Sequence, residues 1–202
     1  MTVDQLNIKY GLVDRKKDFE IIDFFEKNAL TIQNLDEDKD LDTLNAKRCL
    51  MSDYGYSLAK NGQSGKSIPI LTEAIRLHEK DPEFKENIKS STGYKKLVFL
   101  LGEALYKTKR IEESKKIFEK LIILAPDNES YKSWIIGTLN YRRSEISRVT
   151  FIAFIIWMLL FVLFRDSMSG PIRTTSFILG LSIFFTWTTV DIMNWVVKRK
   201  YR

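Results

Sequence analysis

Residues whose types could support chemistry occur in three short stretches, and a glycine-rich run is the first of them. The run Gly62-Gln-Ser-Gly65-Lys66-Ser67 matches the end of a phosphate-binding loop. That loop also requires a glycine five residues before Gly65 and a strand ahead of it, whereas Lys60 stands there and residues 51–60 have a helical pattern. We therefore interpret the run as a turn between two paired helices and expect no nucleotide site.

Acidic residues alternate in the second stretch. Asp36, Asp38 and Asp40 are spaced like the first ligands of a calcium loop. Leu41 and Lys47 occupy the positions where such a loop needs its glycine and its closing glutamate. The segment is therefore expected to be a solvated acidic linker between helices.

The third stretch contains His78, the only histidine of the chain. It has no cysteine or histidine companions at the spacing of a zinc site, and Glu79 and Asp81 are expected on a solvated helix end. Cys49 is the only cysteine, which excludes an intramolecular disulfide and a cysteine-based metal site. We therefore expect no catalytic residues, no metal and no cofactor, and a protein that is not an enzyme.

The elements that would position these residues are all helical. Residues 14–140 have almost no strand signal, and apolar residues recur there at intervals of three and four. Residues 1–141 are thus predicted to form a soluble all-α domain, in which helices are expected at about 14–34, 43–61, 65–80, 88–108, 111–125 and 128–146.

Two segments of this domain share one residue pattern at an offset of 47 residues, as Gly55 and Gly102 illustrate. The first, weaker copy contains Met51, Tyr54, Gly55, Leu58, Ser67, Leu71 and Ala74, and Pro82 closes it late. The second copy contains Tyr94, Val98, Leu101, Gly102, Leu105, Ser114, Phe118, Leu121 and Pro126. This pattern resembles the tetratricopeptide repeat, with Ser114 at the helix crossing, and an insertion around residues 83–92 would account for the long offset.

The resemblance implies an array of helical hairpins whose first helices line a groove for a peptide or helix of a protein partner. By matching positions, the partner-binding surface would comprise Ser52, Tyr56, Lys60, Lys96, Phe99, Glu103, Tyr106 and Lys107. Ser52 and Tyr56 replace the lysine and asparagine by which relatives clamp chaperone tails, so we do not expect that partner.

Two apolar stretches follow, at about residues 146–164 and 175–197, and both are long enough to cross a bilayer. The short connection 165–174 predicts an antiparallel transmembrane helix hairpin within a membrane anchor, residues 142–202. Residues 142–202 hold nine Lys/Arg and three Asp/Glu, so the whole net charge of +6 lies there. Seven of these cations flank the hairpin and two lie in the connection, which predicts that both termini are cytosolic.

Three residues of the second stretch are candidates for contacts between membrane helices. Ser176 and Gly180 form a small-xxx-small pair that lets another helix approach; packing within the hairpin is the alternative. Asp191 is the one charge inside the second stretch, so it either contacts a partner or reaches interfacial water.

The sequence thus favours a membrane-anchored adaptor or assembly factor that binds a protein partner on the cytosolic face. A structural subunit of a transport or export complex is the alternative, and a toxin-neutralising binding protein is a further one. The position of the positive charge beside the spans argues for membrane lipids and against nucleic acid as a partner. A bacterial inner membrane is the preferred location.

Overall fold

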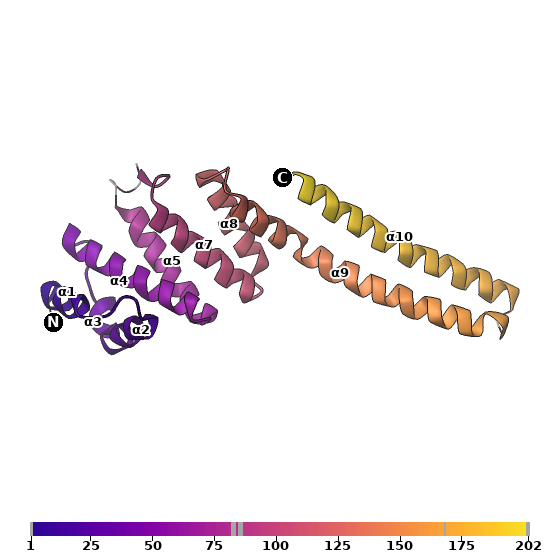
Figure 1. The fold of residues 1–202 in the computed structure, drawn as a ribbon, viewed down its shortest axis with the longest axis horizontal. Helices are drawn as coiled ribbons and strands as arrows, with labels where there is room; N and C mark the ends of the chain where they lie inside the picture. The colour runs from indigo at the N-terminus through magenta and orange to yellow at the C-terminus, as the bar shows by residue number, and fades with distance from the viewer. Residues whose placement is uncertain (1, 82–83, 85–86, 168, 201–202) are drawn as a thin grey trace. The chain divides into compact units, whose positions relative to one another are not determined.

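The computed structural model describes residues 2–81, 84, 87–167 and 169–200, and all regular structure in these residues is helical (Figure 1). The chain divides into two compact units, residues 1–131 and 132–202. Pro82 and part of the insertion expected at residues 83–92 lie outside the described residues. The all-α fold class is therefore confirmed for the part of the chain that the structure describes.

The first unit begins with helices α1 (Val3–Gly11), α2 (Asp18–Lys27) and α3 (Ala29–Gln33). Helix α1 is absent from the elements predicted above, although Thr2 and Gln5 form a capping box at its start. The sequence also predicted one helix over residues 14–34. The structure breaks this segment at Asn28, where α2 ends. The side-chain amide of Asn28 donates a hydrogen bond to the Phe24 carbonyl at 2.8 Å.

Two antiparallel helical hairpins follow, namely α4 (Leu41–Lys60) with α5 (Ser64–Lys80), and α7 (Thr92–Lys107) with α8 (Ile111–Leu124). Helix α5 also packs on α7, so the hairpins stack as neighbours. In the second hairpin a Cβ at Gly102 would lie 2.9 Å from Cζ of Phe118. Ser114 is fully buried at this crossing and donates a hydrogen bond to the Gly102 carbonyl at 2.8 Å.

The same geometry recurs 47 residues earlier, where a Cβ at Gly55 would lie 2.9 Å from Cδ2 of Leu71. The turns within the hairpins correspond too, since Gly62 has a φ of 76° and Lys109 a φ of 62°. The glycine-rich run is thus the α4–α5 turn, as the sequence predicted. The 47-residue offset therefore describes two units of one local structure.

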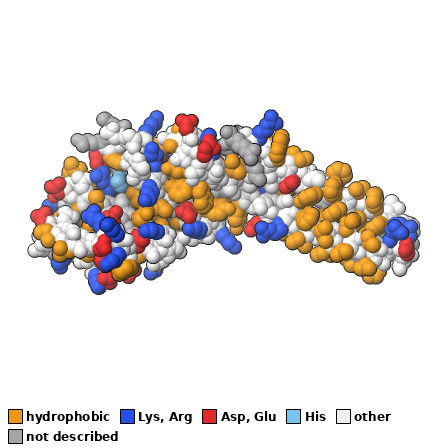
Figure 2. Space-filling view, in the orientation of Figure 1, with side chains coloured by type: hydrophobic (Ala, Val, Ile, Leu, Met, Phe, Trp, Pro, Cys, Tyr) orange, Lys and Arg blue, Asp and Glu red, His pale blue; other side chains and the backbone are white. Residues whose placement is uncertain are grey.

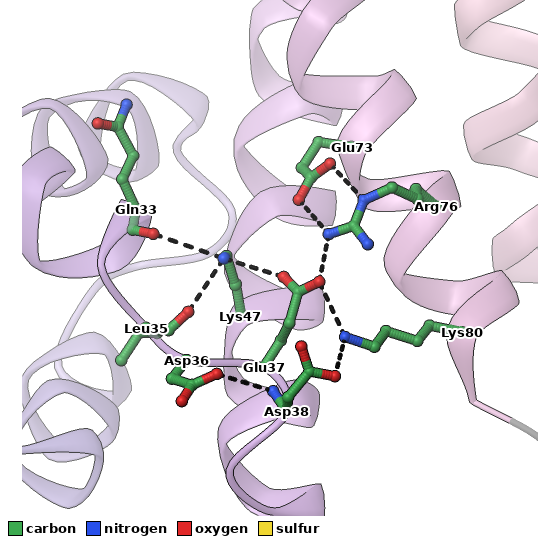
Figure 3. Close-up of polar contacts among 9 residues, drawn as sticks. All are labelled: Gln33, Leu35, Asp36, Glu37, Asp38, Lys47, Glu73, Arg76 and Lys80. Carbon is green, nitrogen blue, oxygen red and sulfur yellow. Dashed lines mark hydrogen bonds and ion pairs between the residues drawn. The ribbon is translucent and has the colours of Figure 1, made fainter.

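The acidic linker is not simply solvated, because Glu37 lies within a cluster of cations (Figure 3). Its carboxylate binds Lys47 of α4 at 3.0 Å and, on α5, Arg76 at 2.5 Å and Lys80 at 3.1 Å. Burial alone would raise the pKa of Glu37, but hydrogen bonds from these cations prevail and hold the pKa at about 2. Lys47 also donates to the Leu35 carbonyl, so the cluster fixes the linker to both helices.

The second unit contains most of α9 (Glu129–Phe164), a short 3₁₀ turn (Arg165–Ser167) and α10 (Gly170–Lys200). Residues Arg143–Ser167 and Gly170–Val197 are long and apolar enough to cross a membrane. The helices pack antiparallel: Phe161 meets Phe177 and Phe151 meets Trp187, with ring centroids 6.5 and 5.4 Å apart. Hydrophobic side chains cover this hairpin on the face drawn in Figure 2.

Candidate functional site

One face of α4 is left open by its neighbours. Its residues recur at helical spacing and are half-buried or exposed; they are Asp42, Asn45, Cys49, Ser52, Asp53 and Tyr56. On the α7 side this face borders a groove of about 460 Å³, which Lys96 and Leu97 also line. On the α1 side it borders a second groove of about 380 Å³. Arg15 and Cys49 belong to the walls of both grooves, so the two adjoin along α4. Together they are called the groove along α4.

The larger groove contains three of the residues that the sequence proposed for partner binding, Ser52, Tyr56 and Lys96. The Nζ atom of Lys96 lies 4.2 Å from the ring centroid of Tyr56, so the side chains of α4 and α7 meet across the groove. Lys60 is exposed at the end of α4 and forms an ion pair with Asp18 at 2.8 Å. Its charge is thus neutralised locally.

The other four proposed residues lie further along α7, outside the residues that line this groove. Phe99 is half-buried and packs on Phe118 and Tyr131, with ring centroids 5.9 and 5.8 Å apart. Glu103 and Lys107 pair with each other at 2.8 Å, and Tyr106 is half-buried. Phe99 therefore contributes to packing, while the ion pair covers the next turn of α7.

His78 lines the larger groove and is held in one tautomer. The Ser52 hydroxyl donates to the Arg48 carbonyl at 2.7 Å, so it can only accept from Nε2 of His78 at 3.2 Å. Nδ1 is then unprotonated and buried, with no hydrogen-bond partner among the described residues. Burial and the positive charge of Arg48 lower the pKa of His78 to about 4, so the ring is neutral at physiological pH.

The expectation that Glu79 and Asp81 lie on a solvated helix end is wrong for Asp81, whereas Glu79 is half-buried. Asp81 is buried and pairs with Arg48 at 2.9 Å. Glu79 accepts hydrogen bonds from the hydroxyl of Tyr94 and the ammonium of Lys120. Arg48, Tyr94 and Lys120 all come from other helices, so the local sequence around His78 does not reveal these contacts.

Sequence reasoning also missed the contribution of the N-terminal segment to the groove. The Tyr10 hydroxyl of α1 donates to Asp53 of α4 at 2.6 Å, and the Arg15 guanidinium carbon lies 4.7 Å from the Tyr10 ring centroid. Burial, and then the hydrogen bond to Asp53, raise the pKa of Tyr10. The helical spacing of Leu6 and Tyr10 was the one signal that α1 packs on the domain.

In the C-terminal hairpin, α9 and α10 approach each other closely at Gly180. A Cβ there would overlap the six-membered ring of Trp157, so hairpin packing accounts for this glycine. Ser176 is half-buried one turn away. Asp191 is exposed, and it has no ion pair or hydrogen bond in the part of the chain that the structure describes.

The described residues contain no group of three His, Cys, Asp or Glu side chains that could hold a metal ion. Comparison with protein-family models, with curated proteins and with solved structures gave no match. The groove along α4 and the apolar hairpin are therefore the features on which a function can be argued.

Proposed function

We propose that this protein is a membrane-anchored adaptor whose helical array, of tetratricopeptide type, binds a segment of a protein partner along α4. The observation that supports the proposal best is the pair of adjoining grooves on the open face of this helix. Its walls mix aromatic side chains with charges, as Tyr56 and Lys96 illustrate. Such a combination is typical of protein interaction sites, where aromatic residues dominate the binding energy.

The anchor would be the α9–α10 hairpin with both termini in the cytosol. Cations flank the spans at Arg143, Arg148 and Arg199, whereas the connection holds Arg165 and Arg173. Short flanking loops rich in Lys and Arg stay on the cytosolic side, and anionic lipids hold such cations at the surface. We favour a bacterial inner membrane, in which the array would present its groove to a cytosolic segment.

Cys49 offers a direct test, because the only cysteine of the chain is exposed and lies in the wall of both grooves. A photoactivatable maleimide on Cys49 of the full-length protein in native membranes should crosslink a partner that occupies the groove. The matched control carries the same reagent in a Cys49→Ser, Lys116→Cys variant, since Lys116 is exposed on α8.

A protein that crosslinks through Cys49, does not crosslink through position 116, and falls several-fold in yield with Tyr56→Ala supports the proposal. Equal labelling from both positions would show that the contact is not specific to the groove. The proposal also fails if an intact complex can be purified but its partner never crosslinks to Cys49.

A second candidate function lies in the membrane, where Asp191 is the supporting observation. An exposed carboxylate within an apolar helix is costly unless it reaches water or another chain, and none of the described residues pairs with it. Asp191 would then join the hairpin to another subunit of a membrane complex. Asp191→Asn should release integral membrane partners from the protein in mild detergent, whereas Asp166→Asn in the connection should retain them.

A further inference from the structure

We propose that the groove along α4 is electrostatically polarised and selects a partner segment with opposite charges at its two ends, a cation toward α1 and a carboxylate toward α7. The inference deepens the proposed function and rests on it. It assigns both the chemical class of the partner segment and the direction in which that segment lies.

The α1 end of the groove is acidic. Asp4 of α1 and Asp42 of α4 line it, and both side chains are exposed. Neither has an ion pair in the described part of the chain. The nearby carbonyl oxygen of the Asn45 side chain is buried and has no hydrogen-bond partner among the same residues. This end therefore presents two unpaired carboxylates and one unpartnered carbonyl oxygen, which a lysine or arginine of a partner would satisfy.

The α7 end has the opposite character. Lys96 is exposed, its ammonium lies against the ring of Tyr56, and no described carboxylate pairs with it. His78 adds no charge at neutral pH, because burial keeps its pKa at about 4. By contrast, Lys60 at the end of α4 is already paired with the carboxylate of Asp18. Lys96 is thus available to bind a carboxylate of a partner.

The middle of the groove is balanced. Arg15 lies over the Tyr10 ring, and Asp53 accepts the Tyr10 hydrogen bond, so one cation faces one carboxylate there. From Asp42 to Tyr56 the helix advances by about 20 Å. A partner of about 14 helical residues, or a shorter extended stretch, would span this length. A segment in the reverse direction would place like charges together at both ends, which disfavours binding.

The test uses a random 16-residue peptide library displayed on phage, selected against the full-length protein in neutral-lipid nanodiscs, with empty nanodiscs as counter-selection. Peptides that compete with a maleimide label on Cys49 occupy the groove. We expect these peptides to carry Lys or Arg toward one end and Asp or Glu toward the other, in a consistent order.

Variants separate the two ends. Asp4→Asn with Asp42→Asn should remove the enrichment of cations and leave that of acids, whereas Lys96→Gln should do the reverse. Each change should weaken an enriched peptide about tenfold, as the loss of a charge-assisted contact implies. Lys116→Gln on α8 is the control and should change neither enrichment.

The outcomes distinguish this inference from the function on which it rests. If groove-binding peptides show no consistent order of charges, or keep the same charge enrichment after every substitution, the proposed polarity of the groove is wrong. The adaptor proposal still stands in that case. A library that yields no peptide displaced by the Cys49 label counts against both.

Discussion

The surroundings of the His78 ring oppose its protonation on balance. Burial and Arg48 lower its pKa, and the charges of Asp81 and Glu79 offset this only in part, so the folded-state pKa is about 4. Because this value lies below the usual 6.5, the unfolded chain binds the proton first. The stability that neutral His78 contributes is therefore complete above pH 6.5 and is lost as the pH falls toward 4.

We predict that the free energy of unfolding falls by about 1–2 kcal/mol between pH 7 and pH 5, allowing for partial solvent access to the ring. Pulse proteolysis of the full-length protein in detergent, across a urea series at each pH, measures this change. His78→Gln keeps a donor for Ser52 but does not titrate, so its stability should vary less over the same range. An equal loss in both proteins would place the titrating group elsewhere.

Lys109 adopts a backbone conformation that suits glycine. Its φ of 62° matches the 76° of Gly62 at the equivalent turn, and a residue with a Cβ is strained in this region. Lys109→Gly should raise the free energy of unfolding by about 0.5–1 kcal/mol, while Gly62→Ala should lower it by a similar amount. Urea midpoints of the two variants check the prediction, and a change of the same sign in both would contradict it.

At the scale of the helices, the close approach of α7 and α8 depends on Gly102. A Cβ there would press on the ring of Phe118, which is fully buried and cannot move away freely. Gly102→Ala should therefore cost about 2 kcal/mol of stability. Gly93 lies in the same helix with nothing within 4 Å of its Cβ position, so Gly93→Ala should be neutral or stabilise by up to about 1 kcal/mol. Equal losses would refute the packing argument.

The sequence predicted best those elements whose residue pattern lies within a single helix or hairpin. The repeated spacing of small and apolar residues identified the hairpins and the 47-residue offset, because the crossing at Gly102 constrains residue size at fixed intervals. The break at Asn28 and the ionic cluster of Glu37 were missed. Glu37 draws its cations from residues 10 to 43 positions away, and no pattern within one helix reports such pairs.

The candidate groove was predicted in part for the same reason. Ser52, Tyr56 and Lys96 were predicted from their positions on one helical face of each repeat, and they line the groove. Phe99 was predicted in the same way but packs on Phe118 instead. Arg15 enters the groove from the connection after α1, a helix absent from the prediction. A site wall contributed by a loop depends on tertiary packing, so the sequence could not supply it.

At the scale of the whole molecule, the two units differ in the kind of surface that they expose. The first unit has paired charges and a groove, while the second exposes apolar side chains such as Ile155, Leu159 and Phe185 to their surroundings. A soluble protein would not expose so continuous an apolar surface. A lipid environment removes this cost. If the hairpin spans a bilayer, the groove can meet a cytosolic partner only when the first unit lies on the cytosolic side.

That orientation yields the last prediction. In sealed bacterial spheroplasts, a membrane-impermeant maleimide should not label Cys49 of the full-length protein until detergent is added. A Cys49→Ser, Ser169→Cys variant moves the cysteine into the connection between the spans and should be labelled from outside. The proposed topology predicts this pattern, because Arg148 and Arg199 flank the hairpin and flanks rich in Lys and Arg are retained on the cytosolic side. Labelling of Cys49 from outside would invert the topology and exclude a cytosolic partner, whereas labelling of neither position would contradict a hairpin that crosses the membrane.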